Sequence, residues 1–389
     1  MELNLFLEPY KEKHESEYTI SKQFSDLVLI YSDPSFFPDL DGIKLALVGV
    51  NEDRKAINNQ GSSIAPDKIR EQLYKLFFHW PEVRMADLGN IKQGHSVEDT
   101  YFALSQVCSQ LINNKIIPII LGGSQDLTFA NYLAYENIGQ LVNLVCVDPA
   151  FDLGNDEDEL HARSYLSKII LHQPNYLFNY TNLGYQSYYI DNGALELMTN
   201  LFFDVYRLGN IHADPEEAEP IVRNADILSF DISAIRAADA PGNANTGPNG
   251  FSGDEACRIC RYAGMSDKLT SIGFYEFNPG LDQNNVTAQL IAQMIWYFID
   301  GYARRSQDIP SSESKRFARY TVKIEGQEDD VVFLRSKKTG RWWIDLSFGR
   351  KDRKKYEKHH FVPCSKKDYE SALQDDIPDR WWQFYQKLM

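Results

Sequence analysis

The order of apolar and polar positions predicts strands that alternate with helices from about residue 44 to residue 305. Apolar runs of strand length occur at residues 44–50, 116–121, 142–147 and 225–228, and further candidate strands at 182–186, 205–211 and 269–276. Between them apolar residues recur at helical spacing, as at Ile69, Leu73 and Leu76, and a long apolar helix is expected from Thr287. Strands that are apolar on both sides are typical of a parallel sheet covered by helices on both faces. The pattern therefore predicts an α/β fold.

The pattern changes after residue 305. Residues 306–314 are polar, include Pro310 and are predicted to form a linker. Short strands are expected at 319–324, 331–334 and 339–346, followed by a last helix that Ser365 caps and that breaks near Pro378. The predicted parts are an N-terminal extension (1–43), an α/β domain (44–305), a linker (306–314) and a small C-terminal α+β appendage (315–389).

Composition narrows the class of protein. The chain has 389 residues and 43% hydrophobic residues, enough for one large domain and an appendage. Its net charge of −15 is uneven, because 18 of the 40 basic residues but only 13 of the 55 acidic ones follow residue 309. An acidic body argues against broad nucleic-acid binding by that part. No apolar run has membrane-spanning length, the first residues lack the pattern of a secretory signal, and five cysteines suggest free thiols. We expect a cytoplasmic protein without membrane insertion.

Polar side chains follow three of the apolar runs. The three stretches are Gly-Gly-Ser-Gln-Asp at 122–126, Asp-Pro-Ala-Phe-Asp at 148–152 and Ser-Phe-Asp-Ile-Ser at 229–233. Side chains at the carboxyl ends of parallel strands converge on one crevice, where α/β enzymes place their chemistry. The sequence therefore predicts a carboxylate-rich site at this edge of the sheet.

These stretches resemble those of the ureohydrolase family, which includes arginase, agmatinase and formimidoylglutamase and writes them G-G-D-H-S, D-A-H-x-D and S-x-D-x-D. Further resemblances lie in the segments 61–70 (G-x-x-x-x-P-x-x-I-R), 87–90 (D-L-G-D), 240–242 (A-P-G), 250–252 and 276–288 (E-x-N-P...D...T-A). The ordered motifs span roughly residues 44–300. The resemblance implies a three-layer α/β/α sandwich with a parallel sheet of about eight strands.

The family's two bridged manganese ions activate a water molecule, and this chain departs from the ligand pattern. The resemblance places Asp148 and Asp231 as bridging carboxylates, Asp152 and Gln125 as private ligands of the first ion, and Ala150 and Ser233 as private ligands of the second. Gln125 and Ala150 replace histidines, and Ser233 replaces an aspartate. We expect no stable dinuclear centre and no bound cofactor. The alternative is one weakly bound manganese ion. Asp126 could supply a substitute ligand if its loop shifted.

Three more residues are candidates for substrate chemistry. His161 resembles the family's proton-shuttling histidine, and Glu276 resembles the carboxylate that orients the substrate's cationic group. Asn155 is assigned with Glu276 to substrate binding. The alternatives are a surface or core histidine and a salt-bridged glutamate. Without a metal, Glu276 and the three aspartates would form an acidic cavity for a cationic small molecule.

Other signals favour ordinary explanations. Cys257 and Cys260 are expected as two thiols on a helix, not as a zinc site, and the acidic run 156–159 as a solvated loop. The basic run 350–355 is expected as a solvated turn, with nucleic-acid binding as the alternative. Two tryptophan pairs, Trp342 with Trp343 and Trp381 with Trp382, form the core of the appendage or, if exposed, a protein-binding surface.

Three functional hypotheses follow. The leading one is an arginase-fold protein that has lost its dinuclear manganese site and acts as a ligand-binding or scaffold protein, with an unknown protein partner at the appendage. The alternative is a metal-dependent hydrolase of C–N bonds in linear amidines, similar to formimidoylglutamase or agmatinase. The third is nucleic-acid binding through the appendage. The resemblance also implies a homo-oligomer.

Overall fold

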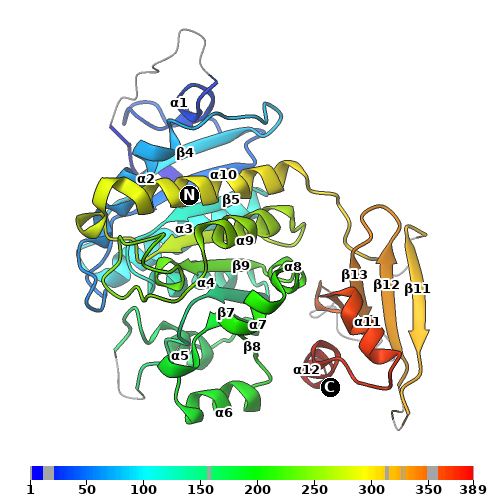
Figure 1. Cartoon of the computed structure of the whole chain (residues 1–389). Helices are drawn as coiled ribbons and strands as arrows, with labels where there is room; N and C mark the ends of the chain where they lie inside the picture. Colours follow the sequence, from blue (N-terminus) through cyan, green and yellow to red (C-terminus); the bar gives the residue numbers. More distant parts are fainter. Residues whose placement is uncertain are drawn as a thin grey trace.

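The computed structural model describes residues 2–11, 22–155, 159–311, 315–325, 327, 329–347 and 358–388. Two sheets organise these residues, a large one in the body and a small one in the appendage (Figure 1). Most of the acidic run 156–159 and the whole basic run 350–355 lie outside the described residues, so their predicted roles stay predictions.

The body is built on a parallel sheet. Its strands are β3 (Leu45–Val50), β4 (Met85–Ile91), β5 (Ile117–Leu121), β6 (Val142–Val147), β7 (Leu177–Tyr185), β8 (Asp204–Arg207), β9 (Ile227–Asp231) and β10 (Ser271–Tyr275). Within the described residues these eight strands pair in parallel in the order β4-β3-β5-β10-β9-β6-β7-β8. Two short strands, β1 (Leu7–Glu8) and β2 (Leu29–Ile30), both pair with β4. The predicted parallel sheet of about eight strands is confirmed.

Helices cover both faces of this sheet. One layer contains α2 (Ala65–Leu73), α7 (Leu208–Ala213), α8 (Ala218–Arg223), α9 (Gly253–Met265) and α10 (Val286–Ala303). The other contains α3 (Val97–Asn113), α4 (Leu127–Ile138), α5 (Tyr165–Leu171) and α6 (Asn192–Asn200), and the short α1 (Phe24–Leu27) lies near the N-terminus. Alternate residues of the strands belong to the two hydrophobic cores. This is why the strands read as continuous apolar runs.

Two predicted elements have different bounds. Residues 205–211 were expected as one strand, but β8 ends at Arg207 and α7 begins at Leu208. Leu208 and Ile211, three residues apart, pack into the core together, as helical spacing allows. Strand β7 begins at Leu177, earlier than the predicted residue 182. The sequence pattern missed this part of the strand because Asn179 is polar, although its side chain is buried and donates a hydrogen bond to the Asp204 carboxylate at 2.6 Å.

A buried ion pair joins α2 to β4. Arg70 is fully buried, and its Nε and Nη2 donate to the two Asp87 carboxylate oxygens at 2.7 and 2.9 Å. Nη1 donates to Asn90 Oδ1 at 2.6 Å and Nη2 also donates to the Gly89 carbonyl at 2.8 Å. The Tyr74 hydroxyl donates to Asp87 as well. The segments 61–70 and 87–90, which resemble two separate family motifs, thus form one polar network under the sheet edge.

The appendage is an antiparallel sheet with two helices. Its elements are β11 (Phe317–Val322), β12 (Val331–Ser336), β13 (Trp342–Asp345), β14 (Phe361–Cys364), α11 (Lys366–Ala372) and α12 (Asp379–Leu388). The strands pair in chain order. Ser365 forms a capping box with Asp368, and the chain leaves helical structure before Pro378, as the sequence predicts.

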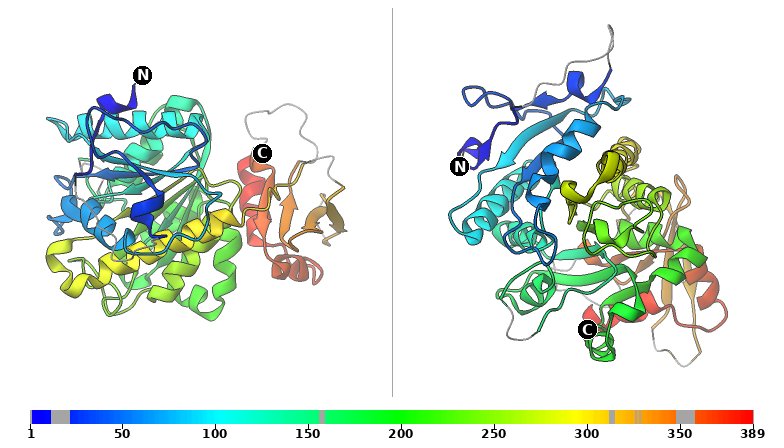
Figure 2. Two further views of the ribbon diagram at one scale, coloured as in Figure 1. Left: turned by 90° about the horizontal axis from the view of Figure 1, so that it is seen from above. Right: turned by 60° about the vertical axis from the view of Figure 1, so that its left-hand side comes forward.

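The appendage packs against the body at the amino-terminal edge of the large sheet. Leu141, just before β6, and Phe178, at the start of β7, share a hydrophobic cluster with the appendage. Arg380 of α12 pairs with Glu217 of the body at 2.7 Å, and Arg223 Nη2 donates to the Trp342 carbonyl at 3.1 Å. The two sheets lie side by side, joined by the segment after α10 (Figure 2). The appendage therefore stands at the edge opposite the predicted carboxylate site.

The tryptophans require a correction. Trp342 and Trp381 are buried in the core between the small sheet and its helices, and Trp343 is buried on the other face of that sheet with Phe317 and Leu334, so none of the three is available as a partner surface. Trp382 is 44% exposed.

Among the described residues, no helix combines the length and apolar character needed to cross a bilayer.

Candidate metal centre

Four neighbouring strands bring the predicted site residues together. Asp148 follows β6 and Asp231 ends β9. Glu276 follows β10, and Gln125 lies in the loop between β5 and α4. These strands are consecutive in the sheet, in the order β5-β10-β9-β6, and run parallel. Their carboxyl ends therefore meet at one edge, as the sequence predicts.

Three carboxylates form the centre of the site. Asp148, Asp152 and Asp231 each offer one carboxylate oxygen, and these oxygens lie within 4.8 Å of one another. Asp148 Oδ1 accepts the Ala150 N–H at 2.7 Å, and Asp231 Oδ1 accepts the Ser233 N–H at 2.6 Å. The other oxygen of Asp148, Oδ2, is buried and has no hydrogen-bond partner among the described residues. Backbone amides thus fix two of the carboxylates and leave a buried acceptor oxygen without a donor.

The cluster carries more negative charge than its surroundings stabilise. Burial above all, and then the charges of Asp152 and Asp231, raise the pKa of Asp148 well above its ordinary value. Burial and the charge of Asp231 raise the pKa of Asp152 to about 7. Burial raises the pKa of Asp231 to about 6, with the nearby Arg163 acting in the opposite direction. A bound cation would relieve this repulsion.

Gln125 presents its amide oxygen without a partner. Its Nε2 donates to Ser229 Oγ at 2.9 Å, and its Oε1 is buried and unpaired among the described residues. The preceding Gly123 is required sterically, because a Cβ there would lie 1.8 Å from the Glu52 carbonyl oxygen. Three carboxylates and an amide oxygen are hard donors of the kind that Mn²⁺ and similar divalent ions accept. The residues present therefore fit one ion.

Among the described residues, the position of the family's second ion has no comparable donors. Ala150 presents a methyl group in the cavity wall, and Ser233, whose backbone N–H donates to Asp231 Oδ1 at 2.6 Å, offers a neutral hydroxyl in place of a carboxylate. Asp126 does not substitute for them, since its buried carboxylate accepts a hydrogen bond from the Tyr101 hydroxyl and does not line the cavity.

The carboxylates lie in a cavity of about 610 Å³. Glu276 lines it with both carboxylate oxygens held, Oε1 by the Gln125 N–H and Oε2 by Asn59 Nδ2, each at 2.8 Å. Its backbone has a φ of +66°, a conformation that non-glycine residues rarely adopt outside functional sites. Burial, then the charge of Asp231, raises the pKa of Glu276. Glu276 is thus a rigidly held carboxyl group in the cavity wall, and no described residue forms a salt bridge with it.

Two predicted residues lie beside the cavity instead of in its wall. His161 is half-buried, and its Nδ1 accepts the Arg163 N–H at 3.0 Å. Asn155 is exposed at the end of a described segment. Neither belongs to the described cavity wall, whereas Arg163 does, with its Nη2 donating to Asn245 Oδ1 at 2.8 Å. Arg163, Asn245 and Asn59 were not predicted, because they come from loops without a recognisable spacing.

The raised carboxyl pKa values predict a pH dependence for chelator-stripped protein. A carboxyl group that ionises less readily when folded stabilises the protein at low pH, and this contribution disappears as the pH rises through the folded-state pKa. For Asp152 the loss extends from about pH 4 to about pH 7. We expect the free energy of unfolding to fall between pH 5 and pH 8. In Asp152→Asn this decrease should be smaller by roughly 1 kcal/mol or more. Urea unfolding at both pH values measures it, and equal slopes in the two proteins would refute the assignment.

Comparisons with known proteins agree with this geometry. The model of the Arginase family matches residues 43–300. The formimidoylglutamase of Streptococcus gordonii is 26% identical over 302 residues, which cover 70% of this chain and 88% of that protein. A Trypanosoma cruzi formiminoglutamase structure with Mn²⁺ superimposes with a TM-score of 0.64 at 16% identity, covering 69% of this chain and 96% of that one. The Bacillus subtilis formimidoylglutamase gives a TM-score of 0.66 at 20% identity, covering 75% and 95%.

Proposed function

The chain belongs to the arginase family, and on that premise we propose that it is a metal-dependent hydrolase of a linear amidine, most similar to formimidoylglutamase. The observation that carries this proposal is the convergence of Asp148, Asp152 and Asp231 in a cavity whose wall also includes Gln125, the amide oxygen of which is buried and unpaired among the described residues. The altered ligand positions favoured a non-catalytic protein without a metal. The names of the relatives and the surviving oxygen donors support the hydrolase instead.

These four residues would hold one manganese ion, with Asp148 and Asp231 as its most buried carboxylates. When bound, such an ion lowers the pKa of a coordinated water so that hydroxide is available near neutral pH. The chain's own groups would do the remaining work. Glu276, held by two hydrogen bonds, is placed to orient a cationic amidinium group, and the excess of carboxylates over Arg163 in the cavity favours a cation. His161, on the loop beside the cavity wall, is our candidate for protonating the leaving amine.

Turnover tests the proposal directly. Purified protein is incubated with N-formimidoyl-L-glutamate, agmatine or arginine, with added Mn²⁺ or with a chelator, and the release of formamide or urea is measured. We expect Mn²⁺-dependent release of formamide from the formimidoyl substrate, and loss of release with the chelator. Bound Mn²⁺ without turnover of any of the three substrates would contradict the proposed activity and return the chain to the ligand-binding hypothesis.

Restoring the family's ligands should restore the second ion. In the double variant Ala150→His/Ser233→Asp, both new side chains enter the wall of the cavity. We expect the manganese content to rise from one to two equivalents per chain, because both private ligands of the second ion return. Elemental analysis after dialysis measures this content. The control is Ser187→Asp, which adds one carboxylate at an exposed turn and should leave the content at one. An unchanged content in the double variant would show that the second position does not form here.

Other expectations remain predictions. Homo-oligomer formation and a protein partner at the appendage, now through Trp382, rest on the resemblance and on one exposed tryptophan. The five cysteines are free and buried, which supports a reducing compartment such as the cytoplasm. Cys257 and Cys260 lie on α9.

A further inference from the structure

A second cavity lies between the body and the appendage, at the sheet edge opposite the carboxylate centre. Its volume is about 310 Å³, within the range of small-molecule sites. Its wall comes from three parts of the chain. The body supplies Asp226 and Lys268, the connecting segment supplies Asp308 and Ile309, and the appendage supplies Trp343 and Phe361. Any occupant would contact all three parts at once.

The apolar part of the wall is aromatic. Trp343 and Phe361 belong to one hydrophobic cluster of the appendage, and Pro363 and Ile309 extend the apolar surface. The guanidinium carbon of Arg223 lies 4.4 Å from the centre of the Trp343 ring, so a cation–π contact covers one face of that ring. A flat apolar group fits this surface better than a flexible or fully polar one.

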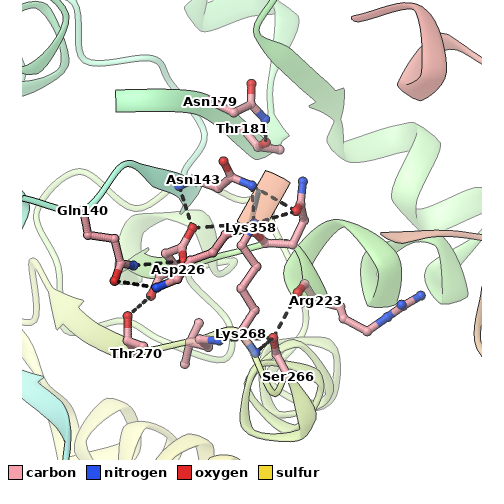
Figure 3. A network of polar contacts seen from close by, with 12 residues as sticks. Gln140, Asn143, Asn179, Thr181, Arg223, Asp226, Ser266, Lys268, Thr270 and Lys358 are labelled. Atoms are coloured by element: carbon pink, nitrogen blue, oxygen red, sulfur yellow. Dashed lines mark hydrogen bonds and ion pairs between the residues drawn. The ribbon is translucent and has the colours of Figure 1, made fainter. Parts of the chain in front are cut away.

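The polar part of the wall has more donors than acceptors. Its carboxylates are already hydrogen-bonded: Asp226 accepts the Asn143 N–H at 2.8 Å, Asp308 accepts Ser336 Oγ at 2.9 Å, and Asp267 accepts the Asp308 N–H at 2.8 Å. The ammonium groups keep spare capacity. Lys358 donates to Gln140 Oε1 at 3.0 Å, and Lys268 contacts Asn224 Oδ1 at 3.0 Å and Asp226 at 3.6 Å, although each ammonium has three N–H donors. Figure 3 shows Gln140, Lys268 and Lys358 gathered around Asp226.

The two cavities differ in the charges of their walls. In the first, within the described part of the wall, Asp148, Asp152, Asp231 and Glu276 face one guanidinium group, that of Arg163. In the second, Glu219 pairs with both Arg223 and Arg341, and Asp226 pairs with Lys268. Among the described residues this leaves Lys358, hydrogen-bonded to Gln140, as the lining cation without a carboxylate partner. The ammonium group of Lys358, with the remaining N–H donor of Lys268, therefore offers hydrogen bonds to an anionic acceptor beside the aromatic wall.

We propose that the cavity between the body and the appendage is a binding site for a small aromatic carboxylate. Its ring would lie against Trp343 and Phe361, and its carboxylate would accept hydrogen bonds from Lys268 and Lys358. The site lies at the amino ends of the strands whose carboxyl ends carry the metal centre, so binding does not require metal.

The test uses a matched pair of probes and the full-length protein. Indole-3-carboxylate and indole-3-carboxamide have nearly the same shape and differ in charge. By calorimetry we expect the carboxylate to bind with a Kd at or below about 1 mM and the amide to bind at least about fivefold more weakly. Lys358→Gln and Lys268→Gln should each weaken binding of the carboxylate at least about fivefold. Lys366→Gln, an exposed lysine on α11 outside the cavity, is the control and should not change it.

The outcomes separate this site from the metal centre. Asp148→Asn, which removes a proposed manganese ligand, should leave carboxylate binding unchanged, so the site and the hydrolase activity can fail independently. No binding of either probe up to about 5 mM would overturn the proposal. Equal binding of the two probes, or equal effects of Lys358→Gln and Lys366→Gln, would also overturn it.

Discussion

Asp148→Asn is expected to abolish manganese-dependent stabilisation and hydrolysis while making the metal-free protein more stable at pH 8. Asparagine keeps an oxygen for the Ala150 N–H, now 2.7 Å from Asp148 Oδ1, so the local backbone is retained. It removes one of three mutually repelling carboxylates. Burial and the charges of Asp152 and Asp231 raise the pKa of Asp148. It also removes a proposed ligand, which should cost more than the ~10–100-fold that loss of an outer partner causes.

Thermal midpoints with Mn²⁺ and with a chelator measure the manganese-dependent stabilisation and the stability of the metal-free protein. In the parent protein, Mn²⁺ at about 100 times its Kd should add about 2.7 kcal/mol to the free energy of unfolding. The control is Asp191→Asn. Asp191 also lines the cavity, but its side chain caps α6 by accepting the Ala194 N–H, which asparagine can do too. This variant should keep the manganese effect. If Asp148→Asn keeps it as well, the ion does not bind at the three aspartates.

Arg70→Met is expected to cost about 3–5 kcal/mol of stability, a large part of what a domain has. Methionine fills most of the space but leaves the buried Asp87 carboxylate without its bidentate partner. Asn90 Oδ1 and the Gly89 carbonyl lose donors as well. The loss therefore comes from an unpaired buried charge more than from packing.

Urea unfolding measures this cost, or the yield of folded protein if the variant does not fold. Arg258→Met is the control, because Arg258 pairs with Asp254 on the exposed side of α9 at 2.8 Å. Removing that surface pair should cost no more than about 0.5 kcal/mol. A cost below about 1 kcal/mol for Arg70→Met would mean that the network relaxes around the lost charge.

The sequence was sufficient for the sheet and for the carboxylate centre. Continuous apolar strands can be buried on both faces only in a helix-covered sheet, and parallel strands bring their carboxyl ends to one edge. Asp148 and Asp231 each lie at a strand end, so the strand pattern predicted that they meet, whereas Glu276, also at a strand end, was identified from the resemblance. The resemblance supplied the assignment of metal positions, which strand pattern does not contain.

The loop residues could not be placed in the same way. His161 and Arg163 are two positions apart in one loop, and only the folded backbone decides that Arg163 enters the cavity wall. Asp126 lies next to Gln125, but Tyr101, distant in sequence, binds its carboxylate. The tryptophan pairs show the same limit, because in one helix Trp381 is 2% exposed and the adjacent Trp382 is 44% exposed.

The most direct test of the central claim is manganese binding to chelator-stripped protein by calorimetry, with elemental analysis of the loaded protein. The surviving ligand set predicts one equivalent of Mn²⁺ per chain, bound more tightly as the pH rises from 5 to 8, because the protons that the raised pKa values retain must leave first. Absence of binding at millimolar Mn²⁺ would contradict the account and favour a non-catalytic protein. Two tightly bound equivalents would contradict the single-ion site.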